Sequence, residues 1–200
     1  MPREVNSGFT HGFNRGFNGR DSGHHAGIPL AALPAMPRTA PTPEQITRHL
    51  RAANSIAAEA LAAGHHPFGA LLVAPDHETV LLHQGNVDAV NHAEAVLARE
   101  AAQRWTPAEL WGCTLYTTVE PCAMCAGTQY WAHIGRVVYG MSEHDLLQLT
   151  GNHAQNPTLA LPCRELFARG QKAMDVIGPV AEVEAEIAAL HARFWRTQPG

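Results

Sequence analysis

Two short motifs constrain this chain more than any other feature of its sequence. The first is His92-Ala93-Glu94, and the second, after residues 95–120, is Pro121-Cys122-Ala123-Met124-Cys125. One histidine and two cysteines offer three metal ligands, whereas a structural zinc ion is normally held by four. A three-ligand site leaves one position for water. The motifs therefore predict a bound Zn²⁺ ion and hydrolytic chemistry.

The spacing within each motif fits ligands at a helix start. If a helix begins at the second motif, Cys122 and Cys125 lie one turn apart and can hold one metal ion. The positive helix end also favours their thiolate forms. Residues 91–98 are rich in helix formers, so His92 is predicted to come from the start of a second helix. Glu94, two residues further on, is expected to approach the water rather than the metal.

The combined pattern H-x-E and P-C-x-x-C resembles the signature of zinc-dependent nucleobase deaminases. Zinc lowers the pKa of a bound water by about eight units in the best cases. The resemblance implies that Glu94 takes the water proton, passes it to a ring nitrogen and later protonates the leaving ammonia. We therefore expect hydrolytic deamination.

Other interpretations of these cysteines and of the metal remain open. A lone C-x-x-C also occurs in redox pairs and structural zinc ribbons. Cys113 precedes a strand-like segment and is interpreted as a small buried hydrophobe, and Cys163 has no partner at motif spacing. A closed four-ligand site using one of them is less favoured. A non-catalytic zinc module is the other class of function, but a structural metal has no use for Glu94.

Length and composition fit one globular domain. The chain has 200 residues, of which 46% are hydrophobic and 16% charged. No apolar run approaches the about 20 residues of a membrane span, and the N-terminus lacks the apolar core of a signal peptide. Four cysteines, two of them in the motif, do not suggest a disulfide framework. We therefore expect a cytoplasmic protein that does not bind membranes.

The distribution of charge bears on the partner. Residues 44–200 contain ten basic and sixteen acidic residues, and Lys172 is the only lysine. A domain that binds nucleic acid usually presents a basic face, and no Lys/Arg cluster is visible here. This balance favours a small-molecule substrate over a nucleic acid.

The first 41 residues differ from the rest of the chain. Gly-Phe pairs recur every four residues and are followed by a proline-rich stretch, a composition that predicts a flexible tail over residues 1–41. Thr42 then offers a helix N-cap, with Pro43 in the first turn and Gln45 at the capping-box position. The deaminase domain is predicted to cover residues 42–200.

Strands alternate with helices along this domain, which predicts an α/β fold with a sheet covered on both faces. The zinc is expected where two helix starts meet the strand ends. The predicted elements are a helix from residue 42 to about 63, strands at 70–74 and 79–83, a helix from 92, a strand at 115–118, a helix from 122, a strand at 136–139, a weak helix at 161–169, a strand at 174–177 and a helix at 181–195.

Several segments together resemble the cytidine deaminase superfamily, and more narrowly its guanine deaminase and tRNA adenosine deaminase branch. They are residues 67–70, Asn86, the His92 motif, residues 120–127 and residues 134–140. The resemblance implies a three-layer α/β/α sandwich of the cytidine deaminase type, with a central mixed sheet, and a homodimer. Free-cytidine deaminases typically have Cys where His92 stands, so this chain is less similar to them.

The resemblance also implies residues that bind substrate. Asn86 matches an asparagine that binds the ring, and Phe68 would pack against the heterocycle. In guanine deaminases an acidic residue shortly after the strand at 136–139 recognises the purine, and Glu143 and Asp145 fall there. A turn asparagine, a core aromatic and exposed loop charges are the structural alternatives. The full predicted set is Phe68, Asn86, Ala93, Trp131, Glu143 and Asp145.

The predicted substrate is a free amino-substituted nucleobase or related heterocycle, with a guanine-like purine or an aminotriazine first. Deamination of adenosine in tRNA is the alternative. The family's tRNA enzymes usually carry a basic C-terminal helix, whereas residues 181–200 contain three glutamates and two arginines. Their usual Asp-Pro-Thr-Ala before the His-Ala-Glu triplet is replaced here by Asp88-Ala89-Val90-Asn91, which changes the loop beside the pocket.

Overall fold

A five-stranded mixed sheet forms the centre of the domain in the computed structural model, which describes residues 38–151, 153–154 and 156–196. The strand order is β2-β1-β3-β4-β5. β1 is antiparallel to both of its neighbours, whereas β3, β4 and β5 run parallel. The strands are β1 (Gly69–Val73), β2 (Val80–Gly85), β3 (Thr114–Val119), β4 (Arg136–Met141) and β5 (Asp175–Ile177).

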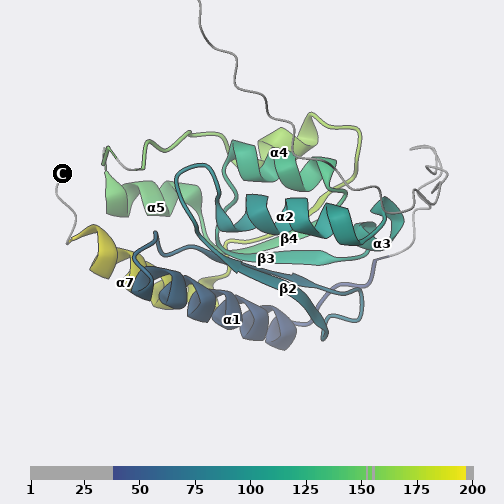
Figure 1. Cartoon of the computed structure of the whole chain (residues 1–200), viewed down its shortest axis with the longest axis horizontal. Coiled ribbons are helices and arrows are strands. Elements are labelled where there is room, and N and C mark those ends of the chain that lie inside the picture. Colours follow the sequence, from purple (N-terminus) through teal and green to yellow (C-terminus); the bar gives the residue numbers. More distant parts are fainter. Residues whose placement is uncertain (1–37, 152, 155, 197–200) are drawn as a thin grey trace, which may run out of the picture. The chain divides into compact units, whose positions relative to one another are not determined.

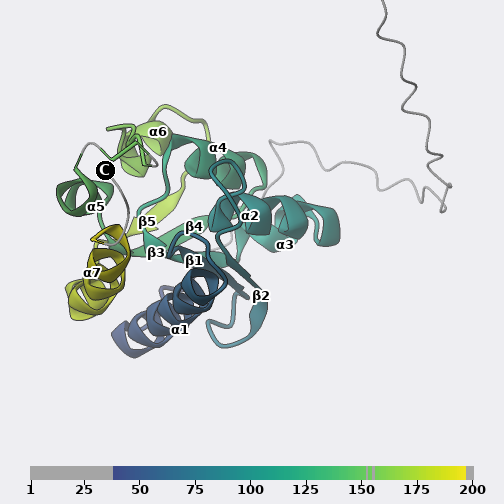
Figure 2. The same cartoon turned by 60° about the vertical axis from the view of Figure 1, so that its left-hand side comes forward.

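Helices cover both faces of this sheet (Figures 1 and 2), which confirms the predicted three-layer α/β/α architecture. One layer consists of α2 (Ala93–Arg104), α3 (Pro107–Trp111), α4 (Ala123–Trp131) and α6 (Cys163–Ala168). The opposite layer consists of α1 (Pro43–Ala62), α5 (Glu143–Thr150) and α7 (Ala181–Trp195). Within the described residues, no helix is both long and apolar enough to cross a bilayer.

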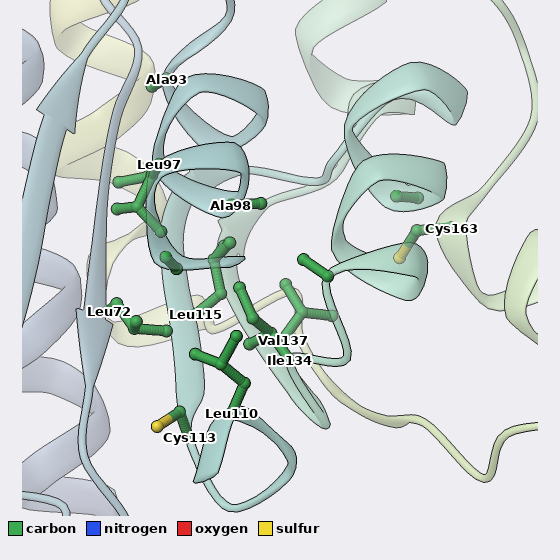
Figure 3. Close-up of a cluster of buried hydrophobic side chains, with 14 of the residues drawn as sticks. Leu72, Ala93, Leu97, Ala98, Leu110, Cys113, Leu115, Ile134, Val137 and Cys163 are labelled. Atoms are coloured by element: carbon green, nitrogen blue, oxygen red, sulfur yellow. The ribbon is translucent and has the colours of Figure 1, made fainter. Parts of the chain in front are cut away.

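Two buried clusters fill the space between the layers because successive strand residues point to opposite faces. Leu72 and Leu115 pack under α2 and α4 in the first cluster (Figure 3), while Leu71 and Tyr116 pack against α1 and α7 in the second. Burying each such leucine contributes about 1.5–3 kcal/mol. The first cluster also contains Cys113, which is 3% exposed and is therefore the small buried hydrophobe that the sequence predicted.

The start of α1 follows directly from its sequence. The Thr42 hydroxyl accepts a hydrogen bond from the Gln45 amide at 3.3 Å, and the Gln45 side chain accepts one from the Thr42 amide at 2.8 Å. The helix then passes close to β1, because a Cβ atom on Gly69 would lie 2.3 Å from the Ala53 carbonyl oxygen. A larger residue than glycine at position 69 would push α1 away from the sheet.

The structure differs from the sequence prediction at two short helices. α3 and α5 are helices of five and eight residues in segments for which no helix was predicted. The predicted tail lies outside the described residues except for residues 38–41. Within these, the Arg38 guanidinium lies 4.4 Å from the ring centroid of Trp111 and 3.0 Å from the Asp175 carboxylate. Arg38 therefore contacts the domain.

Candidate active site

Two helices begin at predicted metal ligands. His92 is the N-cap of α2 and Cys122 is the N-cap of α4, both with extended backbone, and neither side chain makes a capping hydrogen bond. N-caps are usually Ser, Thr, Asp or Asn, whose side chains bond to the helix backbone. Here the two side chains are directed to each other instead. Cys125 joins them from the first turn of α4, where it is buried.

The three side chains fit a zinc ion. The Nδ1 atom of His92 lies 3.6 Å from Sγ of Cys122 and 3.5 Å from Sγ of Cys125. Tetrahedral zinc, with bonds of about 2.3 Å to sulfur and about 2.0–2.1 Å to nitrogen, separates such atoms by about 3.6 Å. Among the described residues this set of three contains neither Cys113 nor Cys163, so the structure brings together the predicted three-ligand set.

The two cysteine side chains differ in protonation state, and one of them is already a thiolate that can bind a cation. A hydrogen bond from Cys125, together with the neighbouring His92, lowers the pKa of Cys122 to about 4, which leaves a thiolate at neutral pH. The same hydrogen bond and burial raise the pKa of Cys125. Cys125 therefore carries a proton that a metal ion would displace on binding.

Glu94 lies beside the ligands in a nearly dry environment. It is 5% exposed, its Oε1 accepts a hydrogen bond from the Thr117 hydroxyl at 2.8 Å, and its Oε2 lies 3.6 Å from Sγ of Cys125. Burial, and next the negative charge of Cys122, raise the pKa of Glu94. A carboxylate with a raised pKa is suited to take up and release a proton during a reaction. The sequence reasoning missed Thr117, although a hydroxyl within a buried strand was a usable signal.

Phe68 and Asn86 lie next to each other beside the ligands. The Phe68 ring is nearly parallel to the His92 ring, at 8° and a centroid distance of 6.4 Å, and the Phe68 carbonyl accepts the Asn86 amide at 2.9 Å. The Asn86 side chain donates to the Asp88 carbonyl at 3.2 Å. Its buried Oδ1 atom has no hydrogen-bond partner among the described residues. Asn86 therefore offers a buried, unpaired acceptor in the segment that is hydrogen-bonded to Phe68.

Of the two acidic candidates in α5, only Glu143 is turned toward the ligands. Burial, and next the charges of Cys122, Glu120 and Glu94, raise the pKa of Glu143 to about 8. Its buried Oε2 atom has no partner within the part of the chain that is described. The Asp145 carboxylate instead bonds to the hydroxyl of Ser142, the N-cap of α5. The Asp145 side chain therefore stabilises the start of α5.

Ala93 lies next to the metal ligands, whereas Trp131 lies far from them. Ala93 is fully buried as the first residue of α2, between His92 and Glu94. Trp131 ends the nine-residue α4, which begins next to Cys122, so about 13 Å of helix separates the two. Its side chain is 75% exposed. The structure does not bring Trp131 to the metal ligands.

Glu120 links the metal loop to the helices that follow it. Its two carboxylate oxygens accept the backbone amides of Cys163 at 3.0 Å and Glu143 at 3.4 Å. These bonds support the interpretation of Glu120 as a structural residue. A cavity of about 210 Å³ opens beside it, lined by Glu120, Glu143, His144, Leu147, Thr158, Ala160, Leu161 and Pro162.

The last turns of α7 pack behind Phe68. The His191 ring meets the Phe68 ring edge-on at 4.9 Å, and Trp195 donates to Nδ1 of His191 at 3.3 Å. Burial lowers the pKa of His191 to about 3, so this imidazole is neutral. His191 therefore packs against Phe68 and restricts the position of its ring.

Comparisons with known proteins agree with this site. Residues 43–141 match the family model described as the cytidine and deoxycytidylate deaminase zinc-binding region. A probable cytosine deaminase of Schizosaccharomyces pombe is 34% identical over 76% of this chain and 93% of its own length. Guanine deaminase of Bacillus subtilis is 38% identical over 48% of this chain and 64% of its own length. A solved tRNA:A34 deaminase superposes with a TM-score of 0.54 and 27% identity over 72% of this chain and 99% of its own. The chain therefore belongs to the cytidine and deoxycytidylate deaminase superfamily, and its enzymatic class is that of a deaminase.

Proposed function

We propose that this protein is a zinc-dependent hydrolytic deaminase of a free amino-substituted base or related heterocycle, with a guanine-like purine or an aminotriazine first. One observation supports the proposed class of substrate. Asn86 Oδ1 and Glu143 Oε2 are buried and, among the described residues, have no hydrogen-bond donor. An unpaired buried acceptor costs about 1–3 kcal/mol, which a ligand with N–H groups would recover.

The chemistry of the acceptors favours a base with several N–H groups. With a pKa of about 8 the Glu143 carboxyl is largely protonated in the free site, and the ring N–H and amino groups of a bound base would stabilise its ionised, accepting form. Guanine and aminotriazines offer such groups, and a plain adenine edge offers them less completely. Phe68, at the side of His92, supplies an aromatic surface for a flat ring. The same features suit a neutral ring better than a charged phosphate, because the acidic side chains of Glu94, Glu120 and Glu143 gather here and a phosphate would add further negative charge.

The proposed reaction consumes water and releases ammonia. A zinc ion held by His92, Cys122 and Cys125 would lower the pKa of water and polarise the reacting centre. Glu94 accepts a proton from the attacking water and delivers it to a ring nitrogen. It then takes the second proton from the hydroxyl of the resulting tetrahedral adduct and gives it to the leaving amino group, so that a C–N bond is exchanged for a C–O bond. Thr117 holds Glu94 in position for these transfers.

Cytosine is a second candidate, favoured by the similarity to the probable cytosine deaminase along most of both chains. It also carries a ring N–H and an amino group. Adenosine in tRNA is less favoured because an RNA substrate needs basic side chains that neutralise its phosphates, and residues 44–200 contain ten basic residues against sixteen acidic ones. In addition, α7 begins with Glu182 and Glu184, which would repel phosphates.

The decisive experiment measures ammonia release by the zinc-loaded protein. The panel contains guanine, isoguanine, aminotriazines, cytosine, adenine, their nucleosides and a tRNA anticodon stem with adenosine at the wobble position. Turnover of free bases alone would support the proposal and rank the purine against cytosine. Turnover of the RNA alone would overturn the substrate class, and zinc binding without any turnover would favour a non-catalytic module.

A further inference from the structure

An open cavity of about 490 Å³ lies between α6 and the edge strand β5, whose positions Figure 2 shows. We call it the α6–β5 pocket. Nine residues line it, and none of them is acidic or a metal ligand. Two of the nine are cationic, Arg164 and Lys172, and three are large and apolar, Phe167, Met174 and Val176.

Lys172 is a buried cation without a counter-ion in the described part of the chain. It is the only lysine of the protein, and it is 9% exposed. The ion pairs among the described residues all involve arginine, and none involves Lys172. Buried charges in proteins are usually paired with an opposite charge. Burial lowers the pKa of this ammonium, and a bound anion would raise it again.

Tyr130 holds the Lys172 ammonium in place. The ammonium donates a hydrogen bond to the Tyr130 carbonyl near the end of α4, and it lies 4.3 Å from the centroid of the Tyr130 ring. The Tyr130 hydroxyl in turn accepts the Gln171 amide at 2.9 Å. The bond to the carbonyl stabilises the end of α4, but an ammonium has three N–H donors. Donors therefore remain for a ligand.

Arg164 supplies the second positive charge of the pocket, from α6. Its guanidinium donates to the carbonyl of Val176 at 2.9 Å and to that of Gly178 at 2.7 Å. These neutral acceptors fix its position and leave its charge without an ion pair among the residues described. The carboxylate of Asp175, in β5, is bonded to two other arginines. The pocket therefore carries two unpaired positive charges in a chain of net charge −4.

We propose that the α6–β5 pocket binds a small organic anion whose carboxylate or phosphate head pairs with Arg164 and Lys172. Its apolar body would pack on Phe167, Met174 and Val176, which line the same cavity. Guanidinium and ammonium groups are the usual partners of such heads. The cavity also lies within the range of about 300–1,000 Å³ that is typical of small-molecule sites. The proposal holds whichever base is deaminated, because the pocket contains none of the metal ligands.

The test measures binding of four compounds to the zinc-loaded full-length protein by isothermal titration calorimetry at constant ionic strength. Benzoate and phenyl phosphate share an apolar ring and differ in the head, inorganic phosphate lacks the ring, and benzamide is a neutral analogue of benzoate. We expect benzoate or phenyl phosphate to bind with a Kd below about 1 mM, and benzamide to bind at least about tenfold more weakly. The tighter of the two ring anions identifies the head.

Two results of this titration would overturn the proposal, namely no binding of either ring anion and equal binding of benzamide. Inorganic phosphate that binds as tightly as the better ring anion would contradict the role of the apolar wall.

Variants then locate the bound anion. Arg164→Gln and Lys172→Met each remove one charge, and each should weaken binding of the better anion at least about tenfold. Arg169→Gln is the matched control and should stay within about twofold of wild-type protein, because Arg169 is an exposed arginine at the end of α6 that does not line the pocket. Lys172→Met also removes the bond to Tyr130, so circular dichroism checks its fold and Arg164→Gln is an independent test. Binding that both variants retain would place the anion elsewhere, for example on the zinc ion, and would overturn the proposal.

Discussion

Helix α1 begins in a different way from helices α2 and α4, which lie on the opposite face of the sheet. In one layer α1 starts at Thr42, whose hydroxyl and capping box serve the helix backbone. In the other layer α2 and α4 start at His92 and Cys122, whose side chains leave the backbone uncapped and point to a common metal position. The metal-binding pattern has therefore replaced a stabilising cap at two helix starts.

The largest expected effect follows from removing a ligand in the metal-site layer. Cys122→Ala should reduce bound zinc from one ion per chain to almost none and abolish ammonia release, because two ligands hold zinc poorly. Metal analysis after dialysis measures the loss. Cys113→Ala is the control, since Cys113 is buried in the core and should cost stability while zinc stays bound. Stoichiometric zinc in Cys122→Ala would contradict the ligand assignment.

Removing the charge of one substrate acceptor should have a smaller effect. At pH 9, where the Glu143 carboxyl with its pKa of about 8 is ionised, Glu143→Gln should retain zinc and lower kcat/KM for the preferred base about 10- to 100-fold, because a hydrogen bond to a charged group contributes about 1.5–3 kcal/mol. Steady-state kinetics measures it. Asp145→Asn is a close control, because Asp145 belongs to the α5 cap and its replacement should leave kcat/KM within about twofold. Equal effects of Glu143→Gln and Asp145→Asn on kcat/KM would contradict the assignment of Glu143, and not Asp145, to substrate binding.

In the opposite layer, changes should act on stability rather than on chemistry. His191 has a folded pKa of about 3 against about 6.5 for an unfolded chain, so the unfolded state binds more protons between these values. Its contribution to stability is complete above pH 6.5 and declines as the pH falls, by about 2 kcal/mol at pH 5.

His191→Asn should therefore flatten the loss of unfolding free energy between pH 7 and pH 5, measured by urea denaturation at each pH. The exposed His83 provides the control, and His83→Asn should retain the wild-type slope. A slope that His191→Asn does not change would show that this imidazole is not held neutral.

The smallest expected effect is at the α1 cap. Thr42→Ala should lower the free energy of unfolding by about 1 kcal/mol, because the Gln45 amide loses its acceptor. Zinc content and kcat/KM should stay at wild-type values, as measured on the same preparation. A loss of zinc in Thr42→Ala would show that the α1 cap and the metal site on the other face of the sheet are not independent.

Local patterns were sufficient to predict the fold and the ligand cluster. The α/β class, ten of the twelve elements in the described part of the chain and the helix starts at His92 and Cys122 follow from residue spacing, helix-forming residues and turn residues. α3 was missed although Thr106-Pro107 and Glu109 repeat the capping pattern of Thr42-Pro43 and Gln45. A five-residue helix is too short to show apolar periodicity, so the cap was its only signal.

Substrate residues were harder to predict because they depend on how elements are placed relative to one another. Glu143 and Asp145 are equivalent by residue type, and only the start of α5 at Ser142 directs one to the site and the other to the cap. Trp131 was chosen as an aromatic near the motif, but the rise of α4 carries it away from Cys122. The roles of Asn86, Phe68 and Ala93 in substrate binding stay predictions.

The central claim is that Glu94 transfers protons beside a zinc ion that it does not hold. The direct measurement is zinc content and ammonia release of Glu94→Gln, with the preferred base, next to wild-type protein. We expect one zinc ion per chain in both and a rate that falls by at least about 10²- to 10⁴-fold in the variant. Ammonia release close to the wild-type rate, with zinc bound, would contradict the proton-transfer role of Glu94.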